Sequence, residues 1–181
     1  MRKLTHAEIV SRQKKKMEGQ RLAFTVILNN VRSLYNVGSI FRTADGVGVE
    51  KIFLCGITGS PPHKQISKTA LGAENQIPWE YREDVISVIH ELKEQGYQIL
   101  LLEQIENSIW YDEFKPTAPI CLVIGNEITG ISDQLISYCD QAIEIEMQGL
   151  KNSLNVAVAF GIVAYHFRTY LKNSVPALTK S

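Results

Sequence analysis

The sequence predicts an α/β domain whose mostly parallel sheet is flanked by helices. The main observation is that apolar runs of strand length alternate with segments of helical periodicity along most of the chain. A hydrophobic content of 45% and a charged content of 21% fit an ordinary globular protein. No linker, repeat or low-complexity segment divides the 181 residues, so we expect one folded domain.

The first predicted element is a basic helix over residues 6–18. Thr5 and Glu8 have the spacing of a capping box, and Gly19 is a plausible helix stop. Residues 1–21 hold seven lysines and arginines against two glutamates, a balance of +5, which leaves −5 for the rest of the chain. A basic arm on a mildly acidic body suggests an anionic partner, although charge alone leaves a merely solvated helix equally open.

The remaining elements follow in alternation. The clearest is a helix over residues 84–96, in which apolar residues recur at three-four spacing before Gly96 ends it. Strands are predicted at 24–28, 51–56, 77–81, 98–104, 120–125 and 142–147, and further helices at 37–47, 64–71, from Ser132 onward and at 154–171. The chain thus divides into a basic N-terminal helical arm (1–21), a folded domain (22–172) and a short C-terminal tail (173–181).

Several classes of protein are disfavoured by what the sequence lacks. Its longest apolar runs are too short or too interrupted to span a bilayer, and residues 1–10 lack the apolar stretch of a signal peptide, so we expect a cytoplasmic protein with no membrane contact. Cys55, Cys121 and Cys139 are odd in number and have no C-x-x-C spacing. Neither a disulfide framework nor a metal site is therefore expected.

The first candidate site is the stretch "YNVGSIFRTADGVGVE" after the first predicted strand. It lacks the G-x-G-x-x-G loop of dinucleotide-binding folds, which excludes the usual pyrophosphate cradle. We expect Asn36 to cap the following helix, and capping alone would explain this residue. Arg42 lies six residues on, about 9 Å along the helix. Both side chains could therefore face one pocket at the helix N-terminus, where a phosphate would also be favoured.

Two further candidate sites follow later strands. In "LVIGNEITGIS" a buried strand ends on Gly125 and is followed at once by Asn126 and Glu127, a pattern that leaves a site and an ordinary loop equally open. In "EIEMQGLKNSLNVAVAFG" polar residues again separate a strand from a helix, and one of them must cap that helix. The helix is apolar on almost every face, which suggests burial against a second subunit.

Taken together, "NVGSIFRTAD", "LVIGNEITGIS" and "IEMQGLKNSLNVAVA" resemble motifs 1, 2 and 3 of the SpoU (TrmH-type) RNA 2'-O-ribose methyltransferases of the SPOUT superfamily. Their order and separations match, and the resemblance covers residues 22–171. It implies an α/β fold with a C-terminal deep trefoil knot, bound S-adenosylmethionine and a homodimer. The implied activity is methylation of a ribose 2'-hydroxyl in tRNA or rRNA.

The resemblance also implies roles for particular residues. The catalytic set would be Asn36, Arg42, Glu127, Ser153 and Asn155. The cofactor would be held around Leu102, Gly125, Ile145, Met147, Ser153 and Leu154. RNA would be contacted by Arg12, Lys14, Lys15, Lys16, Arg32 and Arg42. One departure is Glu146, which stands where the family commonly has a proline, so a fixed φ is lost and a charge is added beside the cofactor loop.

A guanidinium normally stays protonated, so we expect Arg42 to clamp the phosphate beside the target ribose rather than to act as a base. The competing interpretation is a non-catalytic RNA-binding or ribosome-associated dimer that keeps the fold. The intact catalytic set argues against it. A nucleotide-dependent oxidoreductase is disfavoured by the missing glycine loop. The sequence does not decide between tRNA and rRNA.

Overall fold

A seven-stranded parallel sheet forms the centre of the protein. The structure is a computed structural model that describes residues 1–17 and 21–172. The strand order is β3-β2-β1-β6-β4-β7-β5, and the strand pairings are parallel throughout the described residues. The strands are β1 (Phe24–Asn29), β2 (Lys51–Cys55), β3 (Trp79–Arg82), β4 (Gln98–Leu102), β5 (Ile109–Trp110), β6 (Ile120–Ile124) and β7 (Gln141–Glu144). The predicted α/β class is confirmed.

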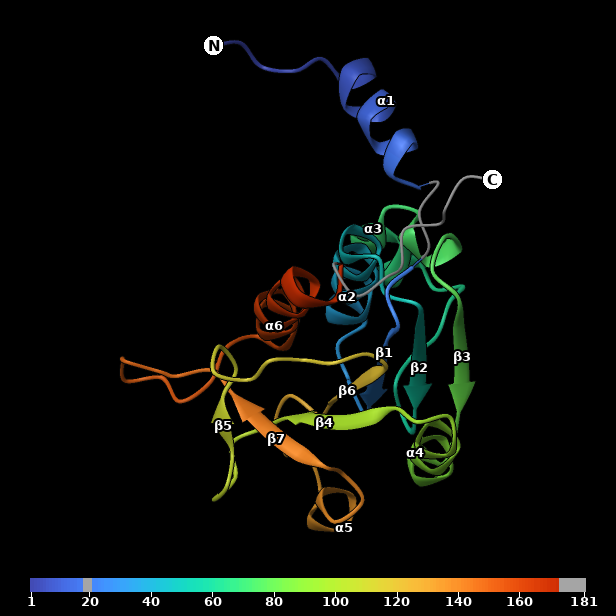
Figure 1. The fold of residues 1–181 in the computed structure, drawn as a ribbon. Helices are drawn as coiled ribbons and strands as arrows, with labels where there is room; N and C mark the ends of the chain where they lie inside the picture. Colours follow the sequence, from blue (N-terminus) through green and yellow to red (C-terminus); the bar gives the residue numbers. More distant parts are fainter. Residues whose placement is uncertain (18–20, 173–181) are drawn as a thin grey trace.

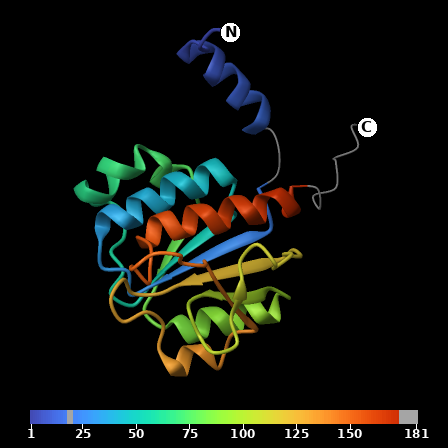
Figure 2. The ribbon, with the colours of Figure 1, turned by 90° about the vertical axis from the view of Figure 1, so that its left-hand side faces the viewer.

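Helices cover both faces of this sheet, as Figures 1 and 2 show. The helices are α1 (His6–Met17), α2 (Leu34–Val47), α3 (Lys64–Ala70), α4 (Val85–Glu94), α5 (Asp133–Ile136), α6 (Val156–Leu171) and a 3-10 turn, η1 (Ala73–Asn75). Helix α1 projects away from the sheet and covers neither face. Helices α2, α3 and α6 lie on one face, and α4 and α5 lie on the other (Figure 2). Successive side chains of β1 divide between these layers: Val26 packs with Phe41 and Phe160, whereas Ile27 packs with Val88.

The order of the strands gathers several loops at one edge of the sheet. Strand β6 lies between β1 and β4 although it follows β4 in the chain, and β7 pairs with the other side of β4. Because these strands are parallel, the segments that follow β1, β4, β6 and β7 all leave from the same edge. In open parallel sheets this carboxyl edge is where ligands bind.

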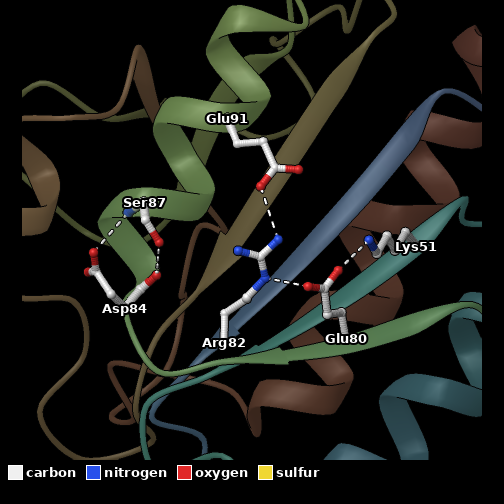
Figure 3. Close-up of polar contacts among 6 residues, drawn as sticks. All are labelled: Lys51, Glu80, Arg82, Asp84, Ser87 and Glu91. Carbon is white, nitrogen blue, oxygen red and sulfur yellow. Dashed lines mark hydrogen bonds and ion pairs between the residues drawn. The ribbon is translucent and has the colours of Figure 1, made fainter.

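The β3 edge of the sheet is closed by charged side chains, drawn in Figure 3. Glu80 of β3 binds Lys51 of β2 at 2.7 Å and also pairs with Arg82. Arg82 in turn reaches Glu91 of α4 at 3.2 Å. Charged side chains on an edge strand oppose edge-to-edge association with another sheet. This chain of ion pairs therefore ties β2, β3 and α4 together at the edge.

Two predicted helix starts need correction. Helix α2 begins at Leu34, not near residue 37, and its N-cap is Ser33, whose side chain accepts a hydrogen bond from the Asn36 N–H. The prediction that Asn36 caps this helix is wrong, because Ser33 already takes that position and places Asn36 inside the first turn. Helix α6 begins at Val156 rather than at residue 154, with Asn155 as its N-cap.

Strand ends also differ from expectation. Strand β7 ends at Glu144, so residues 145–147, predicted as strand, belong to a loop that runs to Asn155. The two-residue strand β5 was not predicted, because a single pair of bridging residues has no sequence period to detect. The predicted stop at Gly19 and the tail at 173–181 lie outside the described residues.

The N-terminal helix has the predicted capping box. The Thr5 N–H donates to Glu8 Oε2 at 2.8 Å, and the Glu8 N–H donates to Thr5 Oγ1 at 3.3 Å. The Arg2 guanidinium, the Thr5 N–H and the Thr5 hydroxyl all donate to the Glu8 carboxylate and lower its pKa to about 2. In the described part of the chain, no helix has both the length and the apolar character needed to cross a bilayer.

Candidate active site

A cavity of about 1010 Å³ opens at the carboxyl edge of the sheet. Its walls come from the segments after β1, β4, β6 and β7 and from the start of α6. All six residues predicted to hold a cofactor line it: Leu102, Gly125, Ile145, Met147, Ser153 and Leu154. The cavity is also lined by Asn36, Glu127 and Asn155 of the predicted catalytic set, but not by Arg42. Residues far apart in the sequence therefore share one site.

One wall of the cavity is a tightly folded loop, residues 125–131. A side chain at Gly125 would place its Cβ 2.6 Å from Ile131 Cγ1 and 2.7 Å from the carbonyl of Gly130. Asn126 and Gly130 form a β-bridge that closes the loop. The side-chain oxygen of Asn126, Oδ1, accepts from the N–H groups of Ile128 and Thr129, while its side-chain amide nitrogen donates to the Asn30 backbone carbonyl at 2.8 Å. Glycine is required at position 125 by this close approach.

Glu103 supports the same loop, and the sequence interpretation missed it. Its carboxylate accepts from the Ile131 N–H at 3.2 Å and from the Gln104 N–H at 2.8 Å. Gly130 has a φ of +63°, and a Cβ there would lie 2.3 Å from Glu103 Oε2. The available signal was an acidic residue directly after the apolar strand "QILLL", in the position that Gly125 holds after β6.

Glu127 joins the second motif to the first. Its carboxylate accepts from the backbone N–H groups of Arg32 at 2.9 Å and Ser33 at 3.1 Å, and from the Asn36 amide at 2.9 Å. Partial burial opposes ionisation of Glu127, but these hydrogen bonds outweigh it and hold the pKa below its usual value. Glu127 is therefore an anion at neutral pH, and it fixes the entry to α2.

Asn155 joins the third motif to the first. Its side-chain oxygen caps α6 by accepting from the Ala157 and Val158 N–H groups at 2.9 and 3.4 Å. Its amide nitrogen is then left to donate to Asn36 Oδ1 at 3.1 Å. Asn36 thus accepts from Asn155 and donates to Glu127. The three side chains form one hydrogen-bonded chain across the cavity.

Arg42 lies apart from this chain. It is exposed on α2, and six residues of helix turn it about 120° around the axis from Asn36. The expectation that both side chains face one pocket is therefore wrong for the single chain. Ser153 is exposed at the cavity wall. Arg32 is exposed and lines the mouth of the cavity.

The predicted basic arm is only partly described. Arg12 is exposed on α1. The side chains of Lys14, Lys15 and Lys16 lie outside the described residues. No hydrogen bond or contact described for the chain joins the arm to the cavity, so its role stays a prediction.

The loop over residues 145–155 forms a more open wall. Its residues are mostly exposed, and a Cβ at Gly149 would meet nothing within 4 Å. Gln104 donates from Nε2 to the Asn152 carbonyl at 2.9 Å and so ties this loop to the segment after β4. Glu146, at the position of the family's proline, accepts from Gln148 Nε2 at 2.5 Å.

The cysteines take no part in this site. Burial raises the pKa of Cys55 to about 12 and that of Cys121 well above its usual value. Neither thiol is therefore a nucleophile at neutral pH. In the described ranges, no group of three or more His, Cys, Asp or Glu side chains is arranged to hold a metal ion.

Comparisons with known proteins converge on one family. Residues 23–165 match the model of the SpoU rRNA Methylase family. A tRNA (guanosine(18)-2'-O)-methyltransferase of Escherichia coli (strain K12) is 31% identical over 150 residues, which are 83% of this chain. The match spans 65% of the length of that relative.

Solved structures of this kind share the fold. The crystal structure of the A. aeolicus TrmH/SpoU tRNA modifying enzyme has a TM-score of 0.79 at 27% identity, covering 92% of this chain and 86% of that one. An AdoMet-bound rRNA methyltransferase from Sinorhizobium meliloti has a TM-score of 0.77 at 29% identity, covering 82% of this chain and 56% of that one.

Proposed function

Because the chain belongs to the SpoU rRNA methylase family, we propose that it methylates a ribose 2'-hydroxyl of tRNA or rRNA with S-adenosylmethionine as the methyl donor. The observation that carries the proposal is the hydrogen-bonded chain from Asn155 through Asn36 to Glu127. It joins the three motifs on the wall of one cavity. A relative that is 31% identical bears the name of a tRNA 2'-O-methyltransferase.

The residues around the cavity fit S-adenosylmethionine. The volume of about 1010 Å³ is at the upper end of the usual range for small-molecule sites. Apolar side chains of Leu102, Ile145 and Leu154 line it together with polar groups, which suits a ligand with an aromatic base and charged ends. Gly125 also lines the cavity, and the close approach of Ile131 and Gly130 to it fixes the loop that forms this wall. When bound, the cofactor supplies an electrophilic methyl group on a sulfonium.

The protein's own residues would act mainly by positioning. Methyl transfer requires the ribose oxygen to be held in line with the sulfur-methyl bond at about 3 to 3.5 Å. The anionic Glu127 fixes the backbone of residues 32 and 33, and through Asn36 it fixes the start of α2. Asn155 sets the orientation of the Asn36 amide while it caps α6. Ser153, beside Asn155, would shape the loop that meets cofactor and substrate.

Arg42 would contact RNA as a permanent cation. A guanidinium is a cation with a planar fork of donors that matches a phosphate, so the role that fits the exposed place of Arg42 on α2 is a clamp on the phosphate beside the target ribose. We expect Arg42→Ala to bind S-adenosylmethionine like the unmodified protein but to lose methyl transfer. Transfer at a near-normal rate would remove Arg42 from the catalytic set.

We further propose a homodimer with the deep trefoil knot expected from the family. An exposed apolar stripe on and before α6 supports the dimer: Leu154, Val158 and Tyr165 are 37%, 52% and 51% exposed. The positions of β6 and β7 on opposite sides of β4 are compatible with a threaded C-terminal segment. Light scattering after gel filtration tests the dimer. A monomeric mass at micromolar concentration would contradict it.

The decisive experiment measures cofactor binding and methyl transfer together. We expect calorimetry to detect binding of S-adenosylmethionine and S-adenosylhomocysteine, and label from tritiated cofactor to enter bulk tRNA or rRNA. Mapping of the labelled ribose would identify the nucleotide. An RNA-binding dimer without activity need bind neither cofactor, so absence of both signals would favour that alternative. A cytoplasmic location follows from these substrates as part of the proposal.

A further inference from the structure

Two segments of the chain have no acidic residue and lie next to each other in the fold. They are residues 21–44 and 51–73. Across residues 19–74 there are six lysines and arginines against three acids, whereas residues 75–181 have seven against fourteen. Of the three acids, Glu74 is buried, while Asp45 and Glu50 lie at the far end of α2 and just before β2. These two segments are therefore the cationic part of the folded domain, whereas the cavity itself is lined by Glu103, Glu127, Asp133 and Glu144 together with Arg32.

Helices α2 and α3 bring these segments into contact. A Cβ at Gly38 would lie 2.1 Å from Thr69 Oγ1 and 2.3 Å from the Ile66 carbonyl oxygen, so only a glycine lets α3 approach this closely. The Thr69 hydroxyl also donates to the Tyr35 carbonyl at 3.0 Å. Figure 1 shows α3 beside α2, on the same face of the sheet. The last turn of α3 is thereby fixed against the first turn of α2.

At this junction an exposed aromatic ring stands among cations. Tyr35 is 43% exposed, and Lys68 Nζ lies 5.9 Å from the centroid of the Tyr35 ring. Arg32, three residues before Tyr35, is exposed and lines the mouth of the cavity. Arg42 is seven residues after Tyr35, so both lie on the same side of α2. Lys64 is exposed one turn before Lys68 on α3.

We propose that Tyr35, Lys64 and Lys68 extend the RNA site from the cavity mouth onto α3, with the Tyr35 ring stacking on an unpaired base. Stacking is sequence-tolerant because every base has a π-face, and flanking cations contact the phosphates. Unpaired nucleotides are the class of RNA that an exposed ring can reach. Arg32 and Arg42 then border a continuous path from the cavity to α3. This inference rests on the proposed function and adds residues outside the three motifs.

The test measures RNA affinity by fluorescence anisotropy with labelled bulk tRNA and labelled fragmented rRNA at several salt concentrations. We expect Tyr35→Ala to weaken binding of the preferred RNA about tenfold and Tyr35→Phe to change it less than about twofold, because the ring carries the contact. The double variant Lys64→Gln/Lys68→Gln should reduce the slope of log affinity against log salt by about 1.4 to 1.8, for two lost phosphate contacts.

The control is Lys93→Gln, which removes a lysine from α4 on the opposite face of the sheet. Lys93 pairs with Asp140 at 2.8 Å, so this variant loses one partly exposed ion pair, worth about 0 to 1 kcal/mol. It should leave both affinity and slope unchanged. All variants are compared for thermal unfolding and for S-adenosylmethionine affinity, which should not move. Since Lys64 and Lys68 are exposed, their variants should fold even if a Tyr35 variant does not. Unchanged affinity and slope in all of them would overturn the proposed surface.

The same assays separate this inference from the proposed function. If the unmodified protein methylates RNA while the Tyr35 and lysine variants match it in kcat/KM and salt slope, the surface is wrong and the activity stands. If the unmodified protein neither binds the cofactor nor transfers label, the activity is wrong. A loss of RNA affinity in Tyr35→Ala would then still support the surface.

Discussion

The two loops that face each other across the cavity are built in different ways. Residues 125–131 are closed by a β-bridge, by the Asn126 side chain and by the Glu103 carboxylate. Residues 145–155 are mostly exposed, and Leu150 in their middle is fully exposed. One wall is therefore organised before any ligand binds, whereas the other is held chiefly at its ends. Residues 125–131 can therefore fix the positions of the groups that meet a ligand, whereas residues 145–155 can adapt to a ligand or partner.

The largest expected effect comes from Gly125→Ala, which adds a methyl group inside residues 125–131, the closed wall of the cavity. Its Cβ would lie 2.7 Å from the Gly130 carbonyl, so the backbone of the loop must shift. We expect destabilisation by about 1 to 3 kcal/mol and S-adenosylmethionine binding at least about tenfold weaker. Thermal unfolding and calorimetry measure both. The control Gly149→Ala, where a Cβ meets nothing within 4 Å, should behave like the unmodified protein. Equal losses of stability and cofactor affinity in Gly125→Ala and Gly149→Ala would show that the two walls do not differ in rigidity.

Glu127→Gln should have the next largest effect, because it weakens the contact from the closed wall to α2. Hydrogen bonds to a charged group contribute about 1.5 to 3 kcal/mol each at most, and exposure reduces this. We expect methyl transfer to fall at least about tenfold with cofactor affinity nearly unchanged. Single-turnover kinetics would separate the two. A variant with weakened cofactor binding and normal transfer would contradict a positioning role.

The depressed pKa of Glu127 also predicts the direction of a pH effect. The carboxylate is stabilised in the folded state, so its contribution to stability is present above the unfolded pKa near 4.5 and is lost as pH falls through the lower folded value. Denaturant titrations between pH 7 and pH 3 should therefore show a smaller loss of stability for Glu127→Gln than for the unmodified protein. Parallel plots of the free energy of unfolding against pH for the two proteins would show that Glu127 does not contribute to the pH dependence of stability.

Gln104→Ala tests the open wall with a smaller change. It removes the bond from Gln104 Nε2 to the Asn152 carbonyl, which is worth about 0.5 to 1.5 kcal/mol. We expect cofactor affinity to fall about two- to tenfold and hydrogen exchange in residues 145–155 to rise. The control is Gln134→Ala, an exposed glutamine of α5 outside the cavity lining. Faster exchange in residues 125–131 instead would reverse the assignment of rigid and adaptable walls.

Glu146→Pro should give the smallest effect, and in the opposite direction. A proline fixes φ in the open loop, which stabilises a compatible conformation by about 0.4 to 1 kcal/mol. Cofactor affinity should therefore rise up to about fivefold. Glu146→Ala, which removes the charge and the bond to Gln148 without fixing φ, separates the two causes. A weaker affinity in the proline variant would mean that the open loop needs a different backbone at this position.

The sequence predicted helix ends and strands correctly where a few adjacent residues decide the local structure. The Thr5–Glu8 capping box, the helix predicted from Ser132 onward and the core strands β1 and β6 were predicted correctly, because apolar period and cap chemistry act over a few residues. The Asn36 cap failed because Ser33 competes for the same role three residues earlier. Serine and asparagine are both favoured N-cap residues, so the sequence alone does not decide whether Ser33 or Asn36 takes that position.

The pattern of the sequence predicted the fold class, and its resemblance to a known family predicted the three motifs and six residues that are among those lining the cavity. Tertiary structure decided how the motifs act on one another. Asn155 caps α6 with its oxygen and thereby leaves its amide for Asn36, and Glu127 reaches α2 because β6 inserts beside β1. The strand order also brings Glu103 to the 125–131 loop, and Gly38 brings α3 to Tyr35. These contacts join residues far apart in the chain, and their directional geometry exists only after the sheet has assembled.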